Sequence, residues 1–141
     1  MDYVVLFVSP YPLHASALAR MLAPVSLKLD HVVSLKRAKN RLGTRPYGAV
    51  LTEARLPDGN WTDVLKFAGA LRFAPAVLVT DRNADDSFWA EILNLGAYDL
   101  LAQPFDSSEV QRILVNACEQ LRAKPVMSTP HATPHVLKAA S

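Results

Sequence analysis

The segment Ala49-Val-Leu-Thr-Glu-Ala-Arg-Leu-Pro-Asp-Gly-Asn-Trp61 passes from an apolar run to a carboxylate and then to a turn. Its apolar start, from Ala49 to Leu51, suits a strand that is covered on both faces of a sheet. The cluster from Pro57 to Asn60 is a turn signal ahead of a helix. Glu53 lies where the strand ends, and in an open α/β sheet functional sites form at such ends.

Apolar runs of similar length alternate with helical patterns along the rest of the chain. The expected strands are 3–8, 27–33, 49–53, 76–80 and 98–102. Helical spacing of apolar residues, with capping residues and Gly or Pro stops, predicts five helices. They run from Pro12 to Pro24, from the Ser34 cap to Gly43, from Trp61 to Leu71, from Phe88 to Gly96, and onward from an Asp106–Glu109 capping box.

This alternation predicts an α/β fold, a three-layer α/β/α sandwich with a parallel sheet and right-handed crossovers. The carboxyl ends of the parallel strands would meet along one edge of the sheet. We therefore expect one crevice that gathers Ser9, Pro10, Glu53, Thr80 and Gln103.

Composition and charge limit the classes of protein that fit. The chain has 141 residues, half of them hydrophobic, and a net charge of +2, which is too small to indicate nucleic-acid or membrane binding by itself. No apolar run is long enough to span a bilayer, and the single cysteine, Cys118, falls in a helical pattern that predicts a buried thiol. We expect a cytoplasmic protein with one domain at 1–123 and a flexible tail at 124–141 rich in Pro, Ala, Ser and Thr.

Four short motifs together resemble the receiver domain of two-component response regulators, the CheY-like family, over residues 3–122. They are Val8-Ser9-Pro10, Glu53-x-x-Leu-Pro57-Asp-Gly, the strand that ends in Thr80, and Leu95-Gly-Ala-Tyr-Asp-Leu-Leu-Ala-Gln-Pro-Phe105. The resemblance implies a flavodoxin-like (βα)5 fold with sheet order 2-1-3-4-5.

The family's phosphorylation chemistry is not matched residue by residue. A working receiver needs an acidic pair for Mg²⁺, an aspartate that accepts phosphate, and a lysine. Here Ser9 and Pro10 replace the acidic pair, Glu53 replaces the phosphoacceptor, and Gln103 replaces the lysine, while the Thr80 hydroxyl is retained. We therefore expect no metal, no Mg²⁺, no cofactor and no phosphorylation.

Two interpretations of Glu53 remain open. Its extra methylene would push the carboxylate out of the crevice, where a fixed charge would imitate the phosphorylated state. Alternatively, the carboxylate is solvated or hydrogen-bonded to Gln103 or Arg82, and this interpretation is favoured because one carboxylate supplies less charge than a phosphate. The switch aromatic of the family is replaced by Leu100, which has no hydroxyl to bond Thr80.

Other residues are assigned to surface or core. Trp89 and Leu100 are expected on a partner face made by the last strand and the two helices that flank it, and one of Trp61 and Trp89 is expected to be exposed. His14 is expected on the surface of the first helix. The basic run Lys36-Arg-Ala-Lys-Asn-Arg41 is interpreted as a solvated helix face. We do not expect His131 and His135 to bind a metal.

We therefore expect a phosphorylation-independent, receiver-like signalling module that acts through protein contacts and is not an enzyme, because no histidine is expected beside Ser9 or Thr80 to act as a base. Its partner would be a histidine kinase, an output protein or a second copy bound through the partner face. Two alternatives stay open: an unconventional phosphoacceptor of a phosphorelay, and a small-ligand sensor that uses the crevice.

Overall fold

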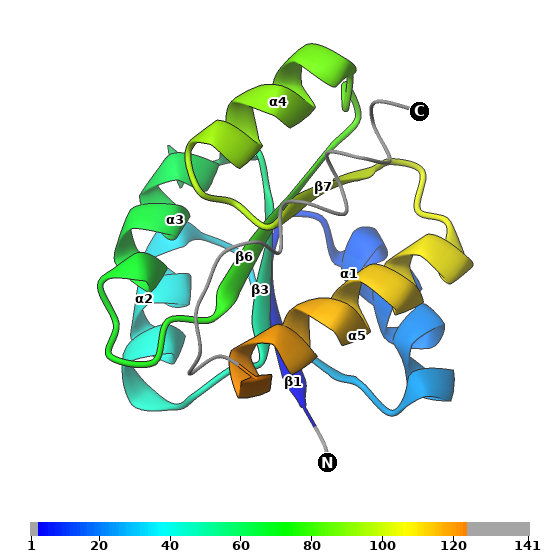
Figure 1. Ribbon diagram of the computed structural model, residues 1–141, viewed down its shortest axis with the longest axis horizontal. Helices are drawn as coiled ribbons and strands as arrows, with labels where there is room; N and C mark the ends of the chain where they lie inside the picture. Colours follow the sequence, from blue (N-terminus) through cyan, green and yellow to red (C-terminus); the bar gives the residue numbers. More distant parts are fainter. Residues whose placement is uncertain (1–2, 124–141) are drawn as a thin grey trace.

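Within residues 3–123, which the computed structural model describes, five parallel strands form the central sheet (Figure 1). The strands are β1 (Val4–Val8), β2 (Lys28–Val32), β3 (Ala49–Glu53), β6 (Ala76–Asp81) and β7 (Asp99–Ala102). They lie in the order β2-β1-β3-β6-β7. Because β6 and β7 are the fourth and fifth strands of this sheet along the chain, this order confirms the predicted order 2-1-3-4-5. Parallel pairing at every step confirms the predicted α/β class.

The helices cover both faces of this sheet, which completes the predicted three layers (Figure 1). On one face lie α1 (Pro12–Leu22), the 3-10 turn η1 (Ala23–Val25) and α5 (Ser107–Ala123). On the other face lie α2 (Leu35–Thr44), α3 (Trp61–Gly69) and α4 (Asp86–Asn94).

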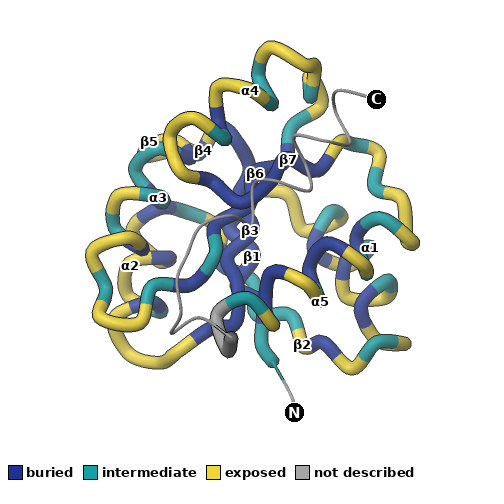
Figure 2. The backbone as a smooth tube through the Cα atoms, viewed as in Figure 1, coloured by how far each residue is buried: buried dark blue, intermediate teal, exposed yellow. Residues whose placement is uncertain are grey.

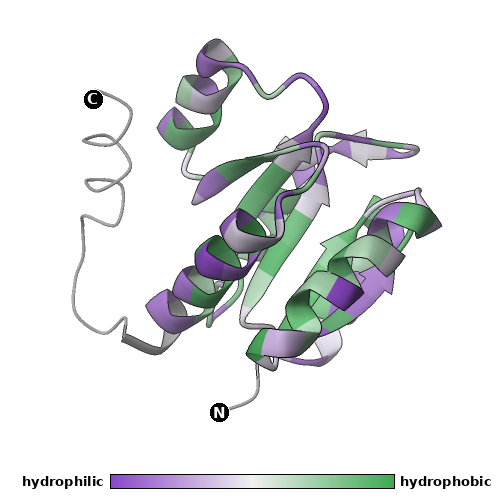
Figure 3. Cartoon of the chain, turned by 90° about the vertical axis from the view of Figure 1, so that its right-hand side faces the viewer, coloured by the Kyte–Doolittle hydropathy of each residue, from purple (hydrophilic) through white to green (hydrophobic). Residues whose placement is uncertain are grey.

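The core is divided by the sheet because successive side chains of a strand point to opposite faces. Leu51 of β3 packs with Leu18 and Leu114 beneath α1 and α5, whereas its neighbour Val50 packs with Val64 beneath α3. Figure 2 shows the central strands as mostly buried, and Figure 3 shows them as largely hydrophobic.

A small hairpin follows β3, and only its turn was expected from the sequence. The strands β4 (Arg55–Leu56) and β5 (Gly59–Asn60) pair antiparallel around Pro57 and Asp58. Asp58 accepts hydrogen bonds from the backbone N–H groups of Leu35 (2.8 Å) and Lys36 (3.0 Å), so the hairpin supplies a carboxylate to the first turn of α2. A Cβ at Gly59 would lie 2.7 Å from Leu35 Cδ2, which favours glycine at this contact.

The expected helix ends differ from the observed ones by a few residues. The second helix continues through Gly43 to Thr44, because the backbone bonding continues as far as Arg45 N–H to the Arg41 carbonyl (3.2 Å). The third helix ends at Gly69, before Leu71. The fourth ends at Asn94, and Gly96 takes the positive φ (106°) predicted for a helix stop.

Cys118 lies on α5 and is fully buried, as predicted. Burial raises the pKa of its thiol to about 12. The backbone of Gly48 approaches so closely that a Cβ there would lie 2.8 Å from the Cys118 sulfur. This contact joins the start of β3 to the middle of α5.

The predicted tail at 124–141, with His131 and His135, lies outside the described residues and stays a prediction. In the part of the chain that is described, no helix has the length and hydrophobicity needed to span a membrane.

Candidate functional site

Four of the five residues expected in the crevice are joined by hydrogen bonds at the carboxyl ends of the strands. Ser9 follows β1, Glu53 ends β3, Thr80 lies near the end of β6, and Gln103 follows β7. The Ser9 hydroxyl donates to Glu53 Oε2 (2.8 Å), and the Gln103 amide donates to Glu53 Oε1 (3.0 Å). Pro10 lies beside Ser9 and is half-buried.

The Glu53 carboxylate is directed inward, and the expectation that it is pushed out of the crevice was wrong. The residue is only 5% exposed. A buried carboxylate is costly unless donors satisfy its oxygens, and here Ser9, Gln103 and His14 donate to it. Of the two partners suggested by the sequence, Gln103 is present, whereas Arg82 is exposed and no bond joins it to Glu53 among the described residues.

His14 belongs to this site, so its assignment to the open surface was wrong. Its Nδ1 lies 2.7 Å from Glu53 Oε2, and its side chain is 34% exposed. An ionised carboxylate only accepts hydrogen bonds, so this geometry places a proton on Nδ1. The ring also lies between two aromatic rings, with centroids at 4.9 Å for Tyr11 and 6.0 Å for Phe105.

A second histidine, His31, also lies at this edge of the sheet. It is on β2, and its Nε2 donates to the carbonyl of Ser9 (2.8 Å). The expectation that no histidine lies near the crevice hydroxyls was therefore wrong. Even so, the Ser9 hydroxyl donates to Glu53 and accepts from the Tyr11 N–H (3.0 Å), and no bond to a histidine activates it among residues 3–123.

The Thr80 hydroxyl is engaged on two sides. It donates to the carbonyl of Leu101 (2.8 Å) and accepts from the Gln103 amide (3.1 Å). One amide group at Gln103 therefore links Glu53 of β3 to Thr80 of β6. The crevice is held by bonds between four neighbouring segments of the chain.

Leu100 and the two tryptophans differ in exposure. Leu100 is only 8% exposed and packs in a cluster with Trp61 and Ile92, because α4 covers this side of β7. Its expected place on a partner face stays a prediction. Trp61 is buried, whereas Trp89 is half-buried and donates from Nε1 to Asp99 Oδ1 (3.0 Å).

Part of the basic run on α2 is paired within the molecule. Arg41 lies 2.6 Å from Asp30, Arg45 lies 4.0 Å from the same carboxylate, and the Tyr47 hydroxyl also donates to it. Burial acts to raise the pKa of Asp30, but the hydrogen bonds from Arg41 and Tyr47 outweigh it and hold this pKa below its usual value. These contacts agree with a role of the run in folding.

The strand order, the parallel crossovers and the crevice at the strand ends are those of the receiver fold. The structure resembles the signal receiver domain of an HD domain-containing protein from Pseudomonas fluorescens, with a TM-score of 0.76 and 21% identity over 88% of this chain and all of the other. It also resembles the receiver domain of the sensor histidine kinase PA1611 from Pseudomonas aeruginosa, with a TM-score of 0.72 and 24% identity over 84% of this chain and 99% of that domain.

A sequence relative is also a response regulator. The chain is 28% identical over 94 residues to the response regulator protein PilR of Pseudomonas aeruginosa, a match that covers 64% of this chain. The matched region spans 21% of PilR. No protein-family model matches the chain.

The residues present do not fit the magnesium ion that the receiver fold implies. The PA1611 receiver domain has a magnesium ion coordinated in its active-site cleft. In this chain both Glu53 oxygens already accept hydrogen bonds, and Ser9 and Pro10 stand where the acidic pair is needed. Among residues 3–123, no group of three or more His, Cys, Asp or Glu side chains is placed to hold a metal. Hard cations such as Mg²⁺ need several free oxygen ligands.

Proposed function

We propose that this chain is a phosphorylation-independent, receiver-like signalling module that acts through protein contacts in a two-component-type pathway. The observation that carries the proposal is the buried Glu53 carboxylate, whose oxygens accept hydrogen bonds from Ser9, His14 and Gln103. The place where a receiver would accept phosphate is filled by these bonds. The receiver fold supports the signalling class.

The electrostatics of the crevice support the absence of phosphoryl transfer. A carboxylate that attacks phosphorus needs a free oxygen, and the transferred group needs cations around it. Gln103 offers a neutral amide where the family has an ammonium, and its two amide hydrogens face Glu53 and Thr80. A phosphoryl group on Glu53 would have to break these bonds and would gain no lysine in exchange.

The connection between the crevice and the partner face also differs from that of a switching receiver. The Thr80 hydroxyl bonds the Leu101 carbonyl, and Leu100 is packed into the core without a hydroxyl of its own. We infer that the face formed by α4, β7 and α5 keeps one conformation. Trp89 is a half-buried aromatic on that face and is a candidate anchor for a partner.

Intact-protein mass spectrometry after incubation with acetyl phosphate and Mg²⁺ tests the proposal. We expect no phosphoryl adduct on the wild-type chain. The variant that carries Ser9→Asp, Pro10→Asp, Glu53→Asp and Gln103→Lys restores the residues of a working receiver and is the positive control. An adduct on the wild-type chain, mapped to Glu53 or to a crevice hydroxyl, would overturn the proposal in favour of a phosphorelay acceptor.

A further inference from the structure

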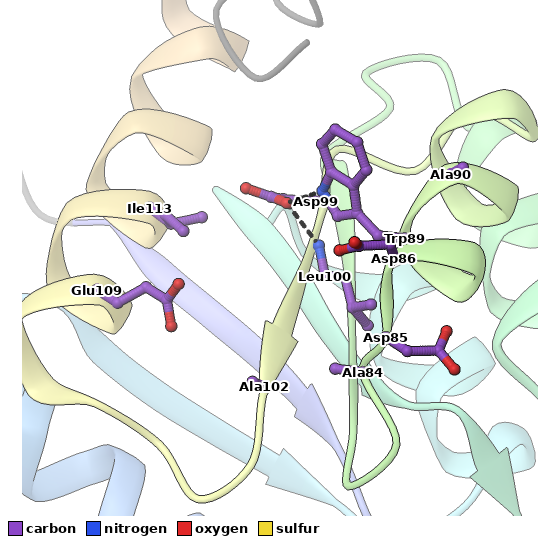
Figure 4. Close-up of a pocket in the computed structure, with 10 residues that line it drawn as sticks. All are labelled: Ala84, Asp85, Asp86, Trp89, Ala90, Asp99, Leu100, Ala102, Glu109 and Ile113. Carbon is purple, nitrogen blue, oxygen red and sulfur yellow. Dashed lines mark hydrogen bonds between the residues drawn. The ribbon is translucent and has the colours of Figure 1, made fainter. Parts of the chain in front are cut away.

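A groove of about 510 Å³ lies between α4 and α5, with β7 as its base (Figure 4). Leu100 lies at its base, Trp89 on the α4 side and Ile113 on the α5 side. We call this feature the α4–α5 groove. It lies on the face assigned above to protein contact, and its lining residues do not include Glu53 or the residues that donate to Glu53.

Carboxylates surround this apolar base. Asp85, Asp86, Asp99 and Glu109 line the groove, and among its described lining residues none is Lys or Arg. Figure 4 shows Glu109 on α5 directed toward the groove from the side opposite Asp86. Asp99 is buried and fixed by hydrogen bonds from the Trp89 indole (3.0 Å) and the Leu100 N–H (2.8 Å). Apolar walls strengthen the field of such charges because they exclude water.

Acidic residues are concentrated on this side of the molecule. Between residues 83 and 121, which include α4, β7 and most of α5, the sequence has seven acidic residues and one basic residue, Arg112, a net charge of −6. The whole chain carries +2. The groove therefore attracts cationic ligands, although the chain as a whole has a net positive charge.

A second copy of this chain is a poor occupant. Symmetric pairing places the same surface on both sides of the contact, so the carboxylates of two grooves would face each other. Like charges brought together at an interface cost binding free energy. The α4 helix has no Lys or Arg that could offset them.

We propose that the α4–α5 groove binds a cationic peptide segment of another protein, one that combines Lys or Arg with an apolar side chain. The apolar side chain occupies the space between Trp89 and Ile113, and the cations pair with Asp86 and Glu109. This inference rests on the proposed function, because it names the chemistry of the partner that the signalling face takes.

The test is a binding titration of the full chain with a dye-labelled synthetic peptide of alternating Lys and Leu, followed by fluorescence anisotropy. We expect saturable binding of this peptide, weaker binding of a Lys/Ser peptide and none of a Glu/Leu peptide. Asp86→Asn and Glu109→Gln should each weaken binding by roughly threefold, as expected for an exposed ion pair. Glu91→Gln and Glu119→Gln, which remove exposed charges from the same two helices outside the groove, should leave it unchanged.

Four outcomes would overturn the inference: no binding of the Lys/Leu peptide, an equal loss in all four variants, displacement of the labelled peptide by a synthetic peptide of residues 124–141, or self-association in sedimentation that Asp86→Asn abolishes. An equal loss in all four variants would mean that the peptide is held by diffuse attraction. Displacement by the 124–141 peptide would mean that the chain's own C-terminal segment occupies the groove, and self-association would mean that a second copy does. Failure of the proposed function is separate, because a phosphoryl adduct in the mass-spectrometric assay would leave peptide binding to the groove intact.

Discussion

The Glu53 side chain has a larger set of donors than its position at a strand end indicates. Ser9 donates from the end of β1, Gln103 from the end of β7, and His14 from the first turn of α1. These hydrogen bonds satisfy both the donors and the carboxylate, and a buried polar group left without a partner lowers the stability of the fold.

Glu53→Gln is therefore expected to lower the free energy of unfolding by about 1–3 kcal/mol. The amide presents N–H where Ser9, His14 or Gln103 donates, and at least one of these donors loses its acceptor. Urea unfolding followed by circular dichroism measures the change. Glu119→Gln on the exposed side of α5 is the control and should have little effect. A Glu53→Gln variant as stable as the wild type would mean that the cost of burying the charge cancels its hydrogen bonds.

The sequence predicted part of this site and missed the rest for a physical reason. The meeting of Ser9, Glu53 and Gln103 follows from strand ends alone, since parallel strands end at one edge. The inward side of α1 depends on how the helix rotates on the sheet, and the sequence does not show it in this turn, because the apolar Leu13 beside His14 is 82% exposed. The burial of Leu100 under α4 could not be predicted either, because a four-residue strand gives no sign of the helix that covers it.

At the scale of elements, the β4–β5 hairpin connects two segments that are distant in sequence. Asp58 in its turn accepts the N–H groups of Leu35 and Lys36 at the start of α2. The backbone hydrogen bond from Leu35, aided by that from Lys36, holds the pKa of Asp58 below its usual value of 3.8. The turn residues predicted a bend, but two-residue strands are too short to predict from sequence.

The depressed pKa of Asp58 sets the sign of a pH dependence. A carboxylate with a lowered folded-state pKa stabilises the fold above its unfolded pKa, and this stabilisation is lost as pH falls through the folded value. Asp58→Asn should thus be less stable than the wild type at neutral pH, and the difference should shrink below pH 3.8. Urea unfolding at a series of pH values measures it, with Glu91→Gln as the control. A difference that stays constant with pH would contradict the capping role of the charge.

For the whole molecule, the sheet order and the three layers were predicted correctly because buried strands and amphipathic helices alternate so regularly. The helix ends were less predictable, since backbone bonding carries α2 past Gly43 and a positive φ at Gly96 fixes the end of α4. The excess of acidic residues between 83 and 121 can be read from the sequence, whereas the groove that four of them line depends on how α4 and α5 pack around β7.

Cys118 gives a measure of the stability of the whole fold. It is the chain's single cysteine, it is buried, and its thiol pKa is raised to about 12. Because the thiolate is the reactive form, alkylation at neutral pH should be slow in the native protein and should rise in urea with the unfolded fraction. Mass spectrometry of iodoacetamide-treated samples measures this. Rapid labelling without urea would show that α5 opens locally from the sheet.

The single amide of Gln103 that joins Glu53 to Thr80 has a consequence for how a cell could use this protein. A receiver with a free phosphoacceptor has a phosphorylated and an unphosphorylated state, and it can be switched between them after it has been synthesised. Under the proposed function, this chain has a single signalling state from the moment it folds. Its output then scales with abundance, so that synthesis and degradation take the place of a kinase and a phosphatase as the controls on the signal.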